Sequence, residues 1–233
     1  MSRVPRVAVT TAVDTAHRVA RLLHLDQLEP VMLPCIRIVT APIEALERLR
    51  AAARDADWIV VTSPRAVRVT WPEGGMPSLP VAAVGAAAAS AATLAGGRVE
   101  VAGKAGAASL LKDLHRLISG KRIAFPHVRS ADPATAAGLR AAGAEVVAES
   151  VYETVPIAPA SDTVDVAIFG SPSAVEGWCR SRSLDGLVVG AIGANTAAAL
   201  TDRGHPSDVV PERPSFESLV EALTQHLREG SAT

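Results

Sequence analysis

Small hydroxyl residues follow two apolar, strand-like runs of this sequence. Thr62 and Ser63 come after WIVV, Ser171 and Ser173 come after VAIF, and a proline follows Ser63 and Ser171 directly. Serine before a proline is typical of a helix start, where serine caps backbone N–H groups and proline occupies the first turn. Helix-start N–H groups can also bind a carboxylate or phosphate. These strand ends are candidate anion sites, with plain helix caps as the alternative.

Two further strand ends carry a glycine before an alanine-rich, helix-like run. They are Gly85 in AVGAAAASAA and Gly193 in AIGANTAAAL. Thr196 lies in the expected first turn of the second run, where its hydroxyl could cap the helix or face a ligand, and Ala88 stands at the matching position of the first. Neither stretch is a GxGxxG or Walker loop, so nucleotide binding has no specific support.

Tyr152 is the only tyrosine of the chain and lies in the extended stretch VYETVP. A phenol at a domain junction can donate a proton or a hydrogen bond to a ligand, whereas a packing role is the alternative. The histidines show no HxxxH or HExxH spacing, and no GxSxG elbow positions a nucleophile. We therefore expect no metal site and no serine-hydrolase chemistry.

Strand-like and helix-like runs alternate along the whole chain. In the first half, strands are expected at 6–12, 29–39, 58–63 and 80–85, and helices at 17–25, 43–54, from about 64, and at 86–97. The second half repeats this rhythm from KRIAFP onward. Such alternation predicts open parallel sheets with helices on both faces. Ligands of these sheets bind outside the carboxyl ends of the strands, where the residues above are expected to lie.

Two constant offsets indicate an internal duplication. The first offset, 108 positions, separates Ser63 from Ser171 and Gly85 from Gly193. The second, 116 positions, separates Val7 from Ile123 and Glu29 from Glu145. We infer four blocks, at about 1–40, 41–118, 119–157 and 158–233. The extended, proline-closed stretches LPCIRIVTAP and ESVYETVPIAP either pair as a ladder linking two domains or form simple edge strands.

Composition excludes several classes of protein. The chain has 233 residues and a formal net charge of −1, so nothing argues for attraction to nucleic acid or to a membrane surface. Cys35 and Cys179 form no CxxC pair, which leaves a disulfide framework or structural zinc unsupported. No signal peptide or transmembrane run is recognisable. We expect a soluble cytoplasmic protein with enough chain for a proper core.

Along nearly its whole length the sequence resembles the uroporphyrinogen-III synthase family. The stretches that carry the resemblance are DWIVVTSPRAV, AVGAAAASAATLAGG, KRIAFPHVRSADPATAAGLRAAGAEVVAESVYETVP, VAIFGSPSAVEGW, AIGANTAAALTDRG and VVPERPSFESLVEAL. Each motif is degenerate by itself, and their order and spacing together make the match specific.

The resemblance implies an α/β fold of two similar open parallel-sheet (flavodoxin-like) domains joined by a two-stranded linker. One domain would be discontinuous, from residues 1–36 plus 158–233. The other, residues 40–150, would be inserted into it, with linker strands at 37–39 and 151–157. The repeat offsets are compatible with this division, but consecutive halves would produce the same offsets.

The resemblance also implies a reaction. The family cyclises the linear tetrapyrrole hydroxymethylbilane, a small molecule with eight carboxylates, to uroporphyrinogen III for heme, siroheme and cobalamin biosynthesis. Loss of a hydroxyl gives an azafulvene, and a spiro intermediate then inverts ring D, without metal or organic cofactor. A monomer acting without nucleic acid or membrane is expected. The task would be mainly one of orienting the substrate.

Carried over by position, Tyr152 and Thr196 match the family's catalytic positions, with Tyr152 assisting departure of the hydroxyl. The residues expected to bind substrate are Thr62, Ser63, Gly85, Arg129, Ser171, Ser173 and Gly193, and Arg65 is a further cationic candidate.

The chain departs from the family pattern at two places. Thr10-Thr11-Ala12 replaces a frequent Thr-Arg-Pro, and Ala88 replaces a frequent threonine. A non-catalytic tetrapyrrole-binding or regulatory module of the same fold is therefore the alternative. A two-lobed sugar or anion receptor is a third reading, disfavoured by the missing signal peptide.

Overall fold

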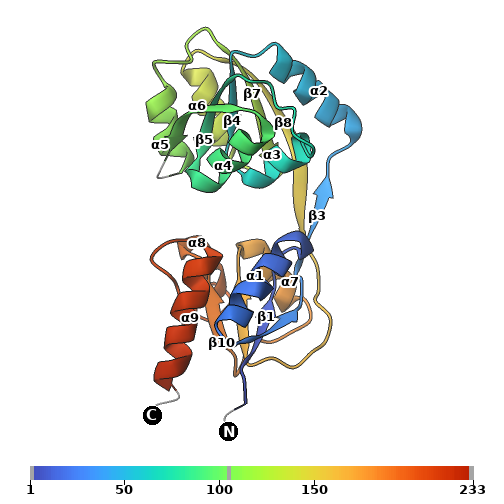
Figure 1. The fold of residues 1–233 in the computed structure, drawn as a ribbon, viewed down its shortest axis with the longest axis vertical. Coiled ribbons are helices and arrows are strands. Elements are labelled where there is room, and N and C mark those ends of the chain that lie inside the picture. The colour runs from blue at the N-terminus through green and yellow to red at the C-terminus, as the bar shows by residue number, and fades with distance from the viewer. Residues whose placement is uncertain (1–2, 104–105, 231–233) are drawn as a thin grey trace. The chain divides into compact units, whose positions relative to one another are not determined.

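The computed structural model describes residues 3–103 and 106–230, and the chain divides into two compact units (Figure 1). Unit 1 comprises Met1–Ile38 and Val155–Thr233, and unit 2 comprises Val39–Thr154. Each unit is an α/β body, and every strand pair whose register is described is parallel, which confirms the expected fold class. That the units are separate folding domains stays a prediction.

Among the described residues of unit 1, the sheet has the strand order β10-β9-β1-β2. Its strands are β1 (Arg6–Val9), β2 (Glu29–Met32), β9 (Val166–Phe169) and β10 (Val188–Ala191). The helices are α1 (Val13–Leu25), α7 (Pro172–Cys179), α8 (Ala194–Thr201) and α9 (Phe216–Gly230). Two apolar clusters cover the opposite faces of this sheet, as its almost uninterrupted apolar strands require.

In unit 2 the described sheet has the order β3-β8-β7-β4-β5-β6. Its strands are β3 (Ile36–Thr40), β4 (Trp58–Val61), β5 (Pro80–Val84), β6 (Arg98–Gly103), β7 (Arg122–Val128) and β8 (Glu145–Pro156). The helices are α2 (Ile43–Arg54), α3 (Pro64–Thr70), α4 (Gly85–Ala95), α5 (Ala107–Leu114) and α6 (Pro133–Ala141). β3 and β8, the strands that cross the unit boundary, are neighbours, and Ala41 N donates to Val151 O at 3.0 Å. The two stretches thus pair with each other, and that their ladder links two domains stays a prediction.

Some elements differ from the sequence expectation. α1 begins at Val13 rather than at 17, and Ala12 before it supplies no side-chain cap that could have marked the start. The expected strand 29–39 is two strands, β2 and β3, separated by residues 33–35, where Pro34 has no N–H to donate. The strand β6 and the helix α5 were not anticipated.

The strand order shows which repeat blocks combine. β1 pairs with β9 in unit 1, and its repeat equivalent β7 pairs with β4 in unit 2. An equivalent contact ties each pair: Asp165 Oδ2 accepts from Arg6 N, and Asp57 Oδ2 accepts from Arg122 N, both at 2.8 Å. The first block therefore combines with the last, and the two middle blocks with each other.

The Asp57 contact predicts a dependence of stability on pH. The hydrogen bond from Arg122 N, followed by the nearby Lys121 charge, holds the pKa of the Asp57 carboxyl below its ordinary value. A carboxyl whose pKa is lower in the folded than in the unfolded state stabilises the fold at pH values above its unfolded-state pKa. This stabilisation is lost as the pH falls through the folded-state pKa. We expect Asp57→Asn to lower the Tm at pH 7 and the deficit to shrink below about pH 4. Melting curves across this range test it, and a constant deficit would contradict it.

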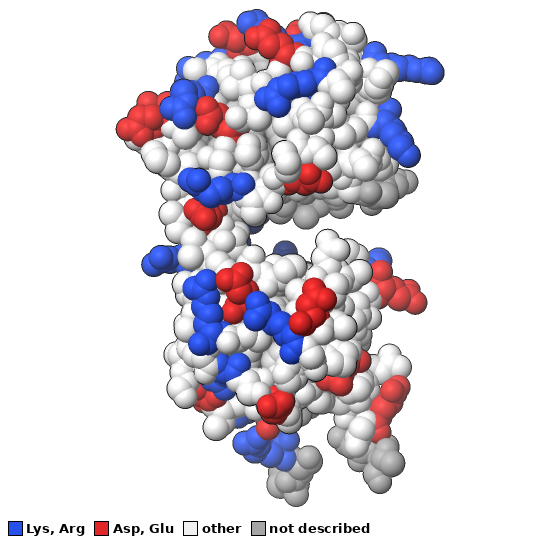
Figure 2. Space-filling model, turned by 180° about the vertical axis from the view of Figure 1, so that it is seen from behind, with Lys and Arg blue, Asp and Glu red and all other residues white. Residues whose placement is uncertain are grey.

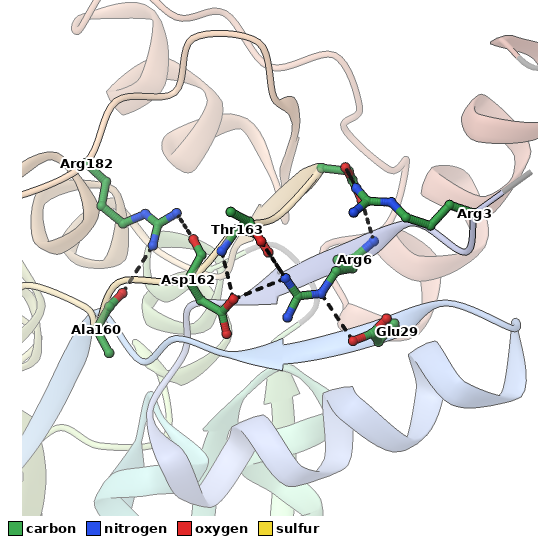
Figure 3. A network of polar contacts seen from close by, with 8 residues as sticks. Arg3, Arg6, Glu29, Ala160, Asp162, Thr163 and Arg182 are labelled. Carbon is green, nitrogen blue, oxygen red and sulfur yellow. Dashed lines mark hydrogen bonds and ion pairs between the residues drawn. The ribbon is translucent and has the colours of Figure 1, made fainter.

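The segment between β8 and β9 is fixed to unit 1 by arginines (Figure 3). Arg6 Nη1 donates to Asp162 Oδ1 at 3.1 Å and to the hydroxyl of Thr163 at 2.8 Å, while its Nε contacts Glu29. Arg182 donates to the carbonyls of Ala160 and Asp162, and its guanidinium lies 4.5 Å from the centre of a tryptophan ring. These contacts hold the segment between β8 and β9 in place within unit 1.

Positive and negative side chains are interspersed on the face shown in Figure 2, in agreement with the near-zero net charge. None of the described helices is long and apolar enough to cross a membrane.

Candidate active site

In unit 2 the candidate residues gather at the carboxyl edge of the sheet. Thr62 and Ser63 follow β4, Gly85 follows β5, and Tyr152 lies opposite Val128, the last residue of β7. Because β8, β7, β4 and β5 are consecutive in the sheet, these positions share one edge. Thr62 and Ser63 are half-buried, and Tyr152 is buried with 7% of its surface exposed.

Ser63 joins the start of α3 to Tyr152. Its Oγ accepts from the N–H groups of Arg65 at 3.1 Å and Ala66 at 3.4 Å, which is the geometry of a helix cap. The same oxygen lies 3.1 Å from the hydroxyl oxygen of Tyr152. The two N–H groups that the sequence analysis expected to be open to an anion are thus engaged by Ser63.

Arg129 lies beside Tyr152 through the backbone, since Arg129 N donates to Tyr152 O at 2.8 Å. Its guanidinium is largely exposed and pairs with Glu153, with Nε 3.1 Å from Oε2. Arg129 therefore offers a charge at this edge that is already paired with a carboxylate.

Gly85 opens α4 without a side-chain cap. Its φ of +77° lies in the left-handed region that favours glycine, and a Cβ added there would meet nothing within 4 Å. Open space therefore adjoins this helix start. Of the two kinds of strand end in unit 2, the one with glycine keeps its N–H groups free of a side-chain cap.

Unit 1 repeats this arrangement at the ends of β9 and β10, which are neighbours in the sheet. Ser171 caps α7, with Oγ accepting from Ala174 N at 3.3 Å, and the half-buried Ser173 lies in the first turn. Gly193 precedes α8 with no side-chain cap, and its carbonyl accepts from Thr196 N at 3.0 Å. Here too the serine end is capped and the glycine end is open.

Thr196 is only 3% exposed, and its hydroxyl has no hydrogen-bond partner within residues 3–103 and 106–230. Every fully buried side-chain nitrogen or oxygen in that part of the chain does have a partner. The Thr196 hydroxyl oxygen must therefore keep contact with solvent. By contrast, Thr201 of the same helix donates to Ala197 O at 3.1 Å. Thr196 thus presents an unused polar group.

The contact of Ser63 with Tyr152 was missed by the sequence analysis, which gave the two residues separate roles. They are 89 positions apart, and no local pattern signals the contact. Thr10, at the departure from the family pattern, uses its hydroxyl on the Ile168 carbonyl at 2.7 Å, so it ties β1 to β9. Its role there is structural.

The described residues contain no group of three or more histidine, cysteine or acidic side chains that could hold a metal ion. Cys35 is fully buried, and this burial raises the pKa of its thiol to about 12, so it stays protonated at neutral pH. The arrangement can therefore donate a proton from a phenol and bind carboxylates through amides and hydroxyls.

Comparison with known proteins gives a consistent result. A family model described as uroporphyrinogen-III synthase HemD matches residues 17–221. The chain is 30% identical to the chloroplastic uroporphyrinogen-III synthase of Oryza sativa subsp. japonica, over 96% of this chain and 81% of the relative.

Two solved structures share the fold, each with a TM-score of 0.66. A mutant uroporphyrinogen III synthase from the extremely thermophilic bacterium Thermus thermophilus is 21% identical and aligns over 97% of this chain and 99% of that one. The uroporphyrinogen-III synthetase from Helicobacter pylori 26695 is 17% identical and aligns over 97% of this chain and 100% of that one.

Proposed function

This chain belongs to the uroporphyrinogen-III synthase family, and from that membership we infer that it converts hydroxymethylbilane to uroporphyrinogen III in tetrapyrrole biosynthesis. The reaction is a cyclisation with loss of water. The observation in the structure that best supports this function is the hydroxyl of Tyr152, which reaches the carboxyl edge of the sheet with Ser63 as its partner. Family membership is independent of that observation.

We propose that Tyr152 gives its proton to the departing hydroxyl of the substrate. The carbon–oxygen bond breaks with its electron pair on oxygen, which takes the phenolic proton and leaves as water. The lone pair of the pyrrole nitrogen compensates for the lost pair by forming a double bond to its ring carbon. The product is the azafulvene in its protonated form. A proton released after ring D has attacked and the macrocycle has closed can return to the phenolate, so the enzyme is regenerated.

We propose that the open helix starts hold acetate and propionate groups of the substrate. Gly85 before α4 and Gly193 before α8 leave N–H groups without a side-chain cap, and such groups suit carboxylates. Thr196 and Ser173 add hydroxyls, as Thr62 does in unit 2. Ser63 and Ser171 contribute less directly because their oxygens already cap α3 and α7. Arg129 is assigned a peripheral charged contact.

Thr196→Val is expected to lower kcat/KM by roughly 10- to 100-fold, since a hydrogen bond to a charged group contributes about 1.5–3 kcal/mol. The Tm should not change, because the Thr196 hydroxyl has no partner in the described protein that the variant would lose. Thr201→Val is the matched control in the same helix and should keep its activity. Wild-type kinetics in Thr196→Val would remove Thr196 from the site.

The product isomer tests the proposed function. Purified protein given freshly prepared hydroxymethylbilane should yield type III porphyrin after oxidation, and a sample without protein should yield type I. Type I alone in both samples would contradict the enzyme and favour the non-catalytic binding module. Thermal stabilisation by a porphyrinogen would then identify that module.

The cellular setting is also proposed. We place the protein in the cytoplasm as a monomer that binds no nucleic acid, a view that the net charge of −1 supports for the last point. Sedimentation at micromolar concentration tests the monomer.

A further inference from the structure

The direction of the hydrogen bond between Ser63 and Tyr152 follows from the other contacts of Ser63. A serine hydroxyl has one proton to donate and two lone pairs to accept with. The Oγ of Ser63 already accepts from Arg65 N and from Ala66 N. Both lone pairs are therefore used at the start of α3. Ser63 can still donate one hydrogen bond, through its own hydroxyl proton.

Tyr152 fits the same assignment. Its hydroxyl contacts Ser63 Oγ at 3.1 Å and has no further partner in the part of the chain that the structure describes. If Tyr152 donated, three donors would converge on one serine oxygen, and the Ser63 proton would have no acceptor among the described residues. With the opposite direction both hydroxyls are used without conflict.

From this geometry we infer that the Ser63 hydroxyl donates a hydrogen bond to the hydroxyl oxygen of Tyr152. The phenolic proton of Tyr152 is thereby kept available for the substrate. Ser63 is thus a positioning residue that acts through Tyr152. The inference rests on the proposed function for the use of that proton. The direction of the bond itself does not depend on it.

The consequence for the reaction is specific. When Tyr152 gives up its proton, the negative charge on its oxygen faces a hydroxyl donor already in place, and preorganised donors stabilise developing charge. The donation from Arg65 N and Ala66 N polarises the Ser63 hydroxyl and strengthens it as a donor. Ser171 also caps α7, through a single N–H and with no phenol as a described partner, so capping alone does not require the contact with Tyr152.

The single tyrosine of the chain makes the bond direction measurable. In the Raman spectrum, the intensity ratio of the tyrosine Fermi doublet is higher when the phenol oxygen accepts a hydrogen bond and lower when the phenol only donates. We compare wild type with Ser63→Asn and Ser63→Asp. Both variants have good capping residues of similar size, but the asparagine amide can donate to Tyr152 and the aspartate carboxylate can only accept. Ser171→Asp is the control for a new carboxylate at an equivalent cap.

We expect wild type, Ser63→Asn and Ser171→Asp to show the high doublet ratio, and Ser63→Asp the low one. The kcat of Ser63→Asp should fall about 100-fold, within the range for loss of a general acid, while Ser63→Asn stays near wild type. The variants are compared by kcat, at saturating substrate, because repulsion between the new carboxylate and an anionic substrate affects KM.

Two results would overturn the inference. A low doublet ratio in the wild-type protein would show that Tyr152 donates to Ser63. This measurement does not depend on whether any variant folds. A doublet change in Ser63→Asp with unchanged kcat would remove the positioning role. If the wild-type protein formed no type III product, the proposed function would fail, and the doublet would still decide the direction of the bond.

Discussion

Tyr152→Phe should lower kcat by a factor of roughly 100 or more, because the phenyl ring has no proton for the departing hydroxyl. The ring itself is buried and should pack as before. Loss of the hydrogen bond to Ser63 should cost about 1 kcal/mol of stability, a small shift in Tm. The measurements are the initial rate of type III product and a thermal melt.

This prediction separates chemistry from folding. A fall in kcat with a nearly unchanged Tm supports Tyr152 as the proton donor. An unchanged kcat would withdraw that role from Tyr152 and from the Ser63 donor that acts through it. A large drop in Tm would assign the phenol a structural function.

Gly177→Ala should have the largest effect on stability. Gly177 lies in α7, and a Cβ added there would be 2.0 Å from the carbonyl oxygen of Cys35 and 2.7 Å from that of Ile157. Both are backbone atoms, and Ile157 N donates to the same Cys35 carbonyl at 2.8 Å, so neither can move cheaply. We expect a loss of about 3 kcal/mol or more, at the upper end for overpacking.

For a chain of this size that loss corresponds to a decrease in Tm of roughly 10 °C, and a thermal melt measures it. Gly230→Ala, in α9, is the matched control, since a Cβ there meets nothing within 4 Å. A Tm for Gly177→Ala equal to that of the control would show that α7 can shift away from these carbonyls. Cys35 and Ile157 lie near the points where the chain leaves and re-enters unit 1, so the close approach of α7 also fixes those points.

Several elements could be predicted from the sequence because their signals are local. The helix α2 was expected at its observed bounds, and the strand β4 was recognised from its apolar run. The start of α1 was placed too late because Ala12 gives no capping signal. Strand β6 escaped notice because it is only partly buried at the edge of its sheet and lacks the continuous apolar run of β4.

The pairing of the repeat blocks depended on tertiary structure. The constant offsets reveal similar halves, yet they are the same whether adjacent or interleaved blocks combine. Only the pairing of β1 with β9 and of β7 with β4 decides between the two. Offsets measure distance along the chain, whereas pairing is decided by hydrogen bonds between strands that are remote in sequence.

The sequence by itself determined which residue types could bind an anion or move a proton, because residue identity sets the donors and acceptors that each side chain offers. It could not decide whether a serine before a helix leaves N–H groups open or caps them, since both uses have the same local pattern. Tertiary structure decided this at Ser63, where two N–H groups occupy the oxygen. It also brought Tyr152 to that oxygen across 89 positions of chain, because a hydrogen bond is set by distance in space and not by separation in sequence.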